Sequence, residues 1–257
     1  MNFKFWLKTA LYRWWPGGYG YLRYLRRYRD TGYIHERDKH SIRRKHYGDV
    51  GWQPPEQQGV LYRNYADYGE YKIHQQQKFD EILKLKGGFN NQIISGYRLK
   101  FYRRFRYIIK LLPRTACIVC AGARQGTEVE VLRDLGFKNA YGIDLNPGPD
   151  NPWVRFGDFM HMENDTSSVD LIYTNCVDHA FNLTDFFAEH RRAIQPDGYV
   201  LYDLALASQF SRGPFEAVAW QSEEALIQLM LRYFRAIIHV ESEPKWKWIL
   251  LQGKRDE

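Results

Sequence analysis

The feature that most constrains the fold is the regular alternation of short apolar runs with amphipathic segments from Thr115 to the end of the chain. The apolar runs have strand length, and helix-like patterns separate most of them. We expect strands at 116–120, 139–143, 154–156, 169–173, 199–204, 236–240 and 246–251, and helices at 127–135, 183–194 and 222–234. This alternation predicts an α/β fold, a doubly wound and mostly parallel seven-stranded sheet with helices on both faces.

The first strand leads into a glycine-containing loop, AGARQG at 121–126, and then into a helix. In such sheets ligands bind outside the carboxyl ends of the strands. Gly122 permits a tight turn beside a ligand, and Gly126 lets the helix pack closely on the strand. Arg124 stands where a central glycine is usual, so its long side chain either points to solvent or reaches toward a carboxylate of the ligand.

Polar residues follow three later strands of the predicted sheet: Asp144, Asp158 and Asn175. Asp144 lies 18 residues after Gly126, close to the spacing at which an acidic side chain accepts hydrogen bonds from a ribose diol. Loop, helix and acid together predict a cofactor that contains a nucleoside. A dinucleotide dehydrogenase is the rival for this loop, whereas the lack of a G-K-[ST] motif excludes a P-loop phosphotransferase.

Four ordered motifs between about 115 and 205 resemble class I S-adenosylmethionine-dependent methyltransferases, in particular the group called type 11. CIVCAGARQGTE resembles the first motif, YGIDLNP the motif with the ribose acid, and VRFGDFMHM the segment that places an Asp near the adenine. DTSSVDLIYTNCVDHAFNLTDFFAEHRRAIQPDGYVLYDL resembles the fourth strand, the following helix and the turn into the fifth strand. The resemblance implies a Rossmann-like fold and S-adenosylmethionine as cofactor.

The resemblance also implies a set of cofactor-binding residues: Gly122, Ala123, Arg124, Gly126, Asp144, Leu145, Asp158, Phe159 and Asn175. Family members commonly carry an acidic residue at the position of Cys120, where it contacts the methionine part of the cofactor. This chain has a neutral thiol there. We therefore expect that contact to be absent or supplied by another residue.

The segment TNCVDHAF after the fourth strand holds the candidate catalytic residues. Methyl transfer to a hydroxyl or amine requires a positioned acceptor and a group that removes its proton. His179 has a pKa suited to a general base, and Asp178 either orients it or contacts the substrate. The alternative is that His179 only caps the next helix. Arg212, after the fifth strand, is a candidate for holding an acidic substrate or is simply a surface loop residue.

Charge divides the chain near Leu112. Residues 1–112 hold 23 Lys and Arg against 9 Asp and Glu, whereas residues 113–257 hold 14 against 21. We expect a basic, aromatic-rich, mainly helical extension at 1–112 and the cofactor domain at 113–257. The basic helices of this extension pack on the domain or in a dimer, lie on a membrane surface through residues 1–30, or bind nucleic acid.

A helix is expected over NYADYGEYKIHQQQKFDEILKL, which begins at Asn64. In class I methyltransferases a helix before the first motif often forms a lid over the cofactor. The resemblance therefore makes Tyr68, Tyr71 and His74 candidates for lining the acceptor pocket. The alternative is that they form an ordinary core face.

Cysteine usage and the N-terminal sequence bound the cellular context. The three cysteines lie in or beside expected strands, which favours apolar packing in a reducing compartment over disulfides or a metal site, and we expect no metal. Lys8 and Arg13 interrupt the N-terminal apolar stretch, so neither a signal peptide nor a membrane span is expected. We expect a cytoplasmic protein, in contact with a membrane if the extension binds lipid.

The expected function is that of an S-adenosylmethionine-dependent methyltransferase acting on a small-molecule or glycan acceptor, including a lipid-linked one. The first alternative is an RNA methyltransferase that uses the basic N-terminal half. The second is a non-catalytic binding protein that kept the fold. The sequence leaves the oligomeric state open.

Overall fold

The computed structural model describes residues 51–53, 59–86, 91–147, 151–205, 215–220, 222–243 and 246–255. Its strands are β1 (Val60–Tyr62), β2 (Ile118–Ala121), β3 (Ala140–Asp144), β4 (Val154–Phe156), β5 (Val169–Thr174), β6 (Ile194–Ala205), β7 (Val218–Trp220), β8 (Phe234–Glu243) and β9 (Trp246–Lys254). The helices are α4 (Tyr68–Lys86), α5 (Asn91–Phe105), α6 (Ile108–Leu111), α7 (Thr127–Asp134), η1 (Val177–His179), α8 (Leu183–Ala193) and α9 (Glu223–Met230).

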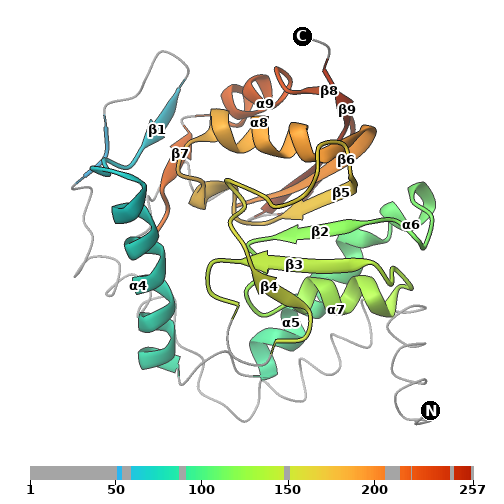
Figure 1. Cartoon of the computed structure of the whole chain (residues 1–257), viewed down its shortest axis with the longest axis horizontal. Coiled ribbons are helices and arrows are strands. Elements are labelled where there is room, and N and C mark those ends of the chain that lie inside the picture. The colour runs from blue at the N-terminus through green and yellow to red at the C-terminus, as the bar shows by residue number, and fades with distance from the viewer. Residues whose placement is uncertain are drawn as a thin grey trace.

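Seven strands form one sheet in the order β4-β3-β2-β5-β6-β9-β8 (Figure 1). The pairs from β4 to β6 are parallel, while β9 runs antiparallel to both β6 and β8. The chain starts at the centre with β2, moves outward to β4 and returns to β5. This reversal places the switch point between β2 and β5, where sheets of this type bind ligands. The Rossmann-like, mostly parallel sheet predicted from the sequence is confirmed.

The two faces of the sheet bury separate cores because strand side chains alternate between the faces. On one face, Val119 and Ile172 pack with apolar residues of α8 and α9. On the other, Ile118 and Leu171 pack with residues of α5 and α7. Figure 1 shows α8 and α9 on one side of the sheet and α7 and α5 on the other, as expected for a doubly wound fold.

Helix α5, which belongs to the predicted N-terminal extension, covers the sheet. Arg104 is 1% exposed and its guanidinium pairs with the fully buried carboxylate of Asp203 at the end of β6. The central carbon of the guanidinium also lies over the ring of Trp248, 4.4 Å from the ring centroid. Residues 91–111 therefore contribute to the same fold as the sheet. Residues 1–50, over which basic amphipathic helices and a membrane contact were expected, lie outside the described residues, as does Arg212.

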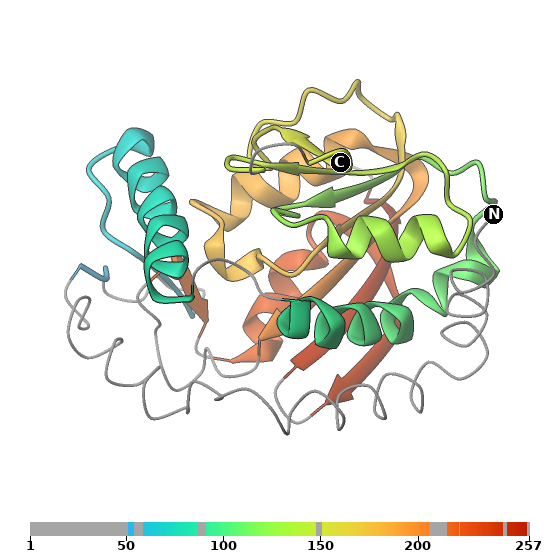
Figure 2. The same cartoon turned by 90° about the horizontal axis from the view of Figure 1, so that it is seen from below.

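A second, two-stranded sheet was not predicted. β1 pairs antiparallel with β7, with Val60 opposite Trp220. Each strand has three residues, too few for an alternation pattern to identify. This small sheet and α4 lie beyond the carboxyl ends of the parallel strands (Figures 1 and 2).

One boundary of the main sheet differs from expectation. The turn Pro196–Gly198 was expected to separate a helix from the fifth strand, but β6 already begins at Ile194. Pairing shifts from Val169 opposite Ile194 to Leu171 opposite Tyr199, so the extra residues form an irregularity within the strand pairing. Among the described helices, none combines the length and apolar character needed to cross a bilayer.

Candidate active site

The glycine loop after β2 adopts the conformation that only glycine accommodates well. Gly122 and Gly126 have φ values of 71° and 69°. A Cβ atom on Gly122 would lie 3.0 Å from Sγ of Cys176, and one on Gly126 would lie 2.9 Å from a methyl carbon of Val154. At both positions a side chain would be strained by the positive φ and would collide with a neighbouring side chain, so both positions require glycine. Ala123, between them, is buried.

Arg124 and Asp144 connect this loop to the end of β3. Arg124 has a φ of 32°, an uncommon conformation for a residue with a side chain. Its backbone N–H donates to Oδ2 of Asp144 over 3.0 Å, and the N–H of Asn146 donates to Oδ1 over 2.7 Å. Asp144 is 8% exposed, so two backbone donors hold its carboxylate in place. Leu145, which follows it, is partly buried.

Asp158, after β4, contacts the beginning of helix α4. Its Oδ1 accepts a hydrogen bond from the N–H of Met160 over 2.8 Å, and its Oδ2 accepts one from the hydroxyl of Tyr68 over 2.6 Å. Phe159 turns into the core, where its ring meets Phe186 edge to face. The structure therefore joins a predicted cofactor residue, Asp158, directly to a predicted acceptor-pocket residue, Tyr68.

The end of β5 faces the glycine loop across the switch point. Sγ of Cys176 lies 3.6 Å from the carbonyl oxygen of Gly122 and 3.2 Å from Oδ1 of Asn175. Burial raises the pKa of the Cys176 thiol to about 12, so this group is a neutral thiol whose single S–H donates to one of these two oxygens. Asn175 is thus held at the junction of β2 and β5, the position that the sequence indicated.

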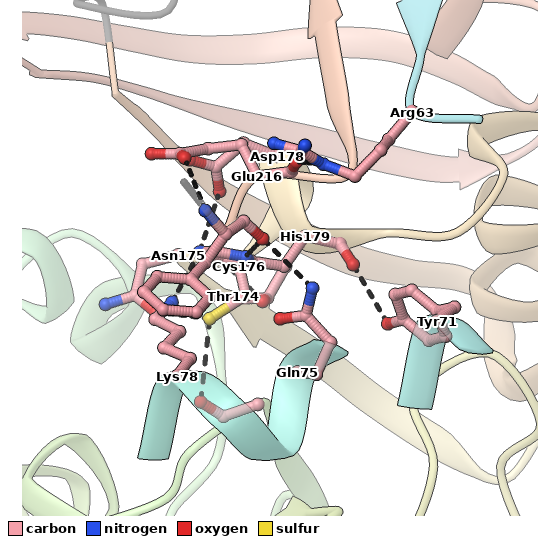
Figure 3. A network of polar contacts seen from close by, with 12 residues as sticks. Arg63, Tyr71, Gln75, Lys78, Thr174, Asn175, Cys176, Asp178, His179 and Glu216 are labelled. Carbon is pink, nitrogen blue, oxygen red and sulfur yellow. Dashed lines mark hydrogen bonds and ion pairs between the residues drawn. The ribbon is translucent and has the colours of Figure 1, made fainter. Parts of the chain in front are cut away.

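His179 uses both ring nitrogens within the protein (Figure 3). Nδ1 lies 2.9 Å from the carbonyl oxygen of Phe215, and Nε2 lies 2.6 Å from Nζ of Lys78 on α4. Burial, and next the charge of Lys78, hold the pKa of the His179 imidazole well below its usual range. Nε2 of His179 is therefore already engaged in a hydrogen bond with Lys78.

Asp178 lies beside the same ring nitrogen, with its Oδ1 3.9 Å from Nε2 of His179, and close to Glu216. Its side chain is 12% exposed, and its backbone carbonyl accepts a hydrogen bond from the N–H of Ala217 over 2.8 Å. Burial, followed by the charge of Glu216, raises the pKa of the Asp178 carboxyl to about 7. Nε of Arg63 donates to the backbone oxygen of Glu216 over 2.9 Å, which ties β1 to the same cluster.

Helix α4 presents one face to this cluster (Figure 3). The Tyr71 hydroxyl donates to the carbonyl oxygen of His179 over 2.9 Å, and the Gln75 amide donates to that of Phe215 over 3.0 Å. His74 is 8% exposed, bonds through Nδ1 to the Tyr65 hydroxyl and stacks on Phe215. These contacts pack α4 across the ends of the parallel strands.

Cys120 is fully buried inside β2, so its thiol is a core group. Glu128, in the first turn of α7, is only 5% exposed and acts electrostatically on Cys120 and Asp144. Burial raises the pKa of the Glu128 carboxyl to about 8. A carboxyl group therefore lies close to the position where the resembling family carries its acid.

Cys117, Cys120 and Cys176 are free thiols. Within the ranges that the structure describes, no three His, Cys, Asp or Glu side chains gather as ligands of one metal ion.

Several residues of this cluster were missed by sequence reasoning: Lys78, Gln75, Glu128 and Glu216. The sequence pattern pointed to Lys78, because residues 71, 74, 75 and 78 fall on one face of a helix. No sequence pattern pointed to Glu216, because it reaches the site through the pairing of β7 with β1. Glu128 resembled an ordinary acid in a first helical turn.

Comparisons with known proteins agree with this geometry. Residues 119–202 match the family model described as a methyltransferase domain. A comparison with curated proteins found no match.

Solved structures share the fold. Burkholderia thailandensis 1,6-didemethyltoxoflavin-N1-methyltransferase, solved with 1,6-didemethyltoxoflavin and S-adenosylhomocysteine, is 15% identical with a TM-score of 0.58, covering 80% of this chain and 100% of its own. The PH0226 protein from Pyrococcus horikoshii OT3 is 16% identical with a TM-score of 0.54, covering 68% and 99%. A chain from the complex of the Haloferax volcanii Trm112 methyltransferase activator with a methyltransferase is 14% identical with a TM-score of 0.52, covering 69% and 98%. Residues 119–202 therefore resemble a methyltransferase domain, and the chain shares its fold with these solved structures.

Proposed function

We propose that this chain transfers a methyl group from S-adenosylmethionine to a small-molecule acceptor that carries an N–H or O–H group. The observation that supports a small acceptor is the seal formed by α4, in which Tyr71 is 1% exposed and His74 and Gln75 are each 8% exposed. A small molecule fits beneath such a lid after a modest movement of the helix, whereas a folded RNA would have to displace it.

The residues around the switch point suit the cofactor. Gly122 and Gly126 allow the positive-φ turns of the loop and its close packing on Cys176 and Val154, and the fixed carboxylate of Asp144 is an acceptor for the ribose diol. Asp158 and Phe159 serve the adenine, with Asn175, Ala123, Arg124 and Leu145 completing the pocket. Glu128 supplies the acidic group that Cys120 lacks, facing the ammonium of the methionine part.

The bound cofactor supplies an electrophilic methyl group: the acceptor atom forms a bond to its carbon, the carbon–sulfur electron pair stays on sulfur, and the acceptor's proton is released. The protein has to position the acceptor in line and receive that proton. The polar cluster between α4 and η1 lies at the strand ends where both tasks are carried out.

Glycan and lipid-linked acceptors belong to the same proposal, since a single sugar hydroxyl is also a small group. The Burkholderia thailandensis relative was solved with a small molecule, 1,6-didemethyltoxoflavin. RNA is the competing acceptor, and the basic residues 1–50 that favour it lie outside the described residues.

A radiolabelled transfer assay tests the proposal. The purified full chain is incubated with tritiated S-adenosylmethionine and with panels of phenols, amines, nitrogen heterocycles, monosaccharides, polyprenyl-linked sugars and total RNA. We expect label in a small organic product, and less of it with the Asp144→Asn variant when the cofactor concentration is limiting. Label in RNA alone would support the RNA alternative, and S-adenosylhomocysteine binding without any transfer would support a non-catalytic protein.

A further inference from the structure

We propose that Lys78, carried by the lid helix α4, is the catalytic base that takes the acceptor's proton, and that His179 is the residue that positions it. This inference rests on the proposed function. It reverses the roles that the sequence indicated, in which His179 was the base.

The hydrogen bonds of His179 define its tautomer. The carbonyl oxygen of Phe215 can only accept, so the ring nitrogen facing it, Nδ1, carries the proton. Nε2 of the neutral ring then has only a lone pair, and Lys78 Nζ, 2.6 Å away, has to be the donor. The lowered pKa of the imidazole agrees with a neutral ring. The lone pair of His179 is therefore already used.

The amine of Lys78, unlike the imidazole of His179, can keep a lone pair that is not used in a hydrogen bond. Burial lowers the pKa of Lys78 below that of an ordinary lysine. A neutral amine has two N–H groups and one lone pair. One N–H is committed to Nε2 of His179, which orients the amine and leaves the lone pair for a proton from the acceptor.

Charged and titratable groups from every neighbouring element face this amine: Arg124 from the glycine loop, Cys176 and Asp178 from the end of β5 and η1, His179, and Glu216 before β7. Arg124 disfavours the ammonium form, whereas the two carboxyl groups favour it. Once Lys78 has accepted a proton, Asp178 and Glu216 stabilise the resulting ammonium. The same acids provide a route by which the proton returns to solvent.

The position of Lys78 suits a base in methyl transfer. Cys176, one of its neighbours, contacts the carbonyl oxygen of Gly122, so the amine lies at the junction of β2 and β5. Lys78 belongs to α4, which also bonds to Asp158 and to His179 through Tyr68 and Tyr71, so these contacts hold the helix that carries the base.

The protonation state of Lys78 is measured by NMR on the full chain labelled with ¹³C at lysine Cε. The Lys78 resonance is assigned from its absence in Lys78→Arg, and the exposed Lys110 of α6 is the reference. We expect the Lys78 resonance to titrate below the ordinary pKa of a lysine side chain, about 10.4. Titration at that ordinary value would overturn the proposal.

Calorimetry with S-adenosylhomocysteine on the same sample separates this proposal from the proposed function. Binding together with an ordinary Lys78 titration removes only the base assignment. Absence of binding removes the proposed function, whatever the lysine does.

Kinetics with two kinds of acceptor distinguish a base from a structural lysine. With an N–H or O–H acceptor from the transfer assay, Lys78→Arg should lower kcat about 10²- to 10⁴-fold, because arginine stays protonated. With an acceptor that has no proton to lose, such as a pyridine nitrogen, Lys78→Arg should retain the parent rate. The control Lys110→Arg should retain the parent rate with both kinds of acceptor. Equal losses with both acceptors would contradict the proposal.

Discussion

The backbone N–H of Arg124 donates a hydrogen bond to Oδ2 of Asp144 over 3.0 Å, joining the glycine loop to the end of β3. The residue that looks like a defect in the loop therefore takes part in fixing the carboxylate of Asp144. The left-handed backbone at Arg124 is strained by about 1–2 kcal/mol, and the hydrogen bond to a carboxylate offsets a strain of that size. An arginine at this position is compatible with a working cofactor loop.

Asp144→Asn should weaken cofactor binding. The carboxamide has one oxygen where the carboxylate has two, so either Arg124 or Asn146 loses its acceptor and meets an N–H group instead. A lost hydrogen bond to a charged group corresponds to about 1.5–3 kcal/mol, or about 10- to 150-fold in affinity. Calorimetric titration with S-adenosylhomocysteine measures it, with the exposed Asp165→Asn as control. Equal affinities for Asp144→Asn and the parent protein would show that this carboxylate does not hold the ribose.

Gly122→Ala should destabilise the fold and block the pocket. The new methyl group would lie 3.0 Å from Sγ of Cys176 on a backbone with a φ of 71°. We expect a loss of about 1–2 kcal/mol from the backbone alone, measured by urea unfolding. Cys176→Ala removes the sulfur atom that the new methyl group would meet. The double variant Gly122→Ala with Cys176→Ala should therefore lose less free energy of unfolding than the sum of the two single variants. Additive losses would contradict the close approach.

Glu128 should make stability depend on pH. Its native pKa of about 8 exceeds the ordinary value of 4.5, so between these values the native state keeps a proton that the unfolded chain releases. The contribution is fully present below about pH 4.5 and is lost as pH rises through about 8. Unfolding of the parent and of Glu128→Gln across this range should show the parent losing stability relative to the variant. A constant difference would contradict the buried position, and the exposed Glu163→Gln provides the control.

Tyr68→Phe should loosen the lid. The variant keeps the ring stack on Tyr71 but loses the 2.6 Å bond from the hydroxyl to Asp158. A bond to a carboxylate stabilises by about 1.5–3 kcal/mol, so amide hydrogen exchange in α4 should become about 10-fold faster or more. Tyr107→Phe, between α5 and α6, should leave α4 exchange unchanged. Unchanged exchange in Tyr68→Phe would show that the lid does not depend on this contact.

The main sheet was predictable because its strands are buried and bounded by helix signals. The positions of individual residues at the strand ends were also predictable from that pattern. Parallel strands bring their carboxyl ends to one edge of the sheet, where Gly122, Asp144, Asp158 and Asn175 lie. The lid contacts were predictable only in part. Spacing placed Tyr71, His74 and Lys78 on one helical face, but it gave no information on the partner of that face.

The role of His179 shows why the chemistry was harder to predict than the position. The sequence placed an imidazole at the right strand end. Its availability depends on the carbonyl of Phe215 and the amine of Lys78, which lie 36 residues after it and 101 residues before it. Such distant partners meet only through tertiary packing of α4 and of the segment before β7.

The most direct test of the account is isothermal titration calorimetry of the purified full chain with S-adenosylhomocysteine, paired with thermal unfolding in its presence. The account predicts saturable binding at one site per chain and a raised unfolding temperature, both weakened in Asp144→Asn. No heat of binding and no thermal shift at millimolar ligand would contradict the claim that the loop from Gly122 to Gly126 holds this cofactor.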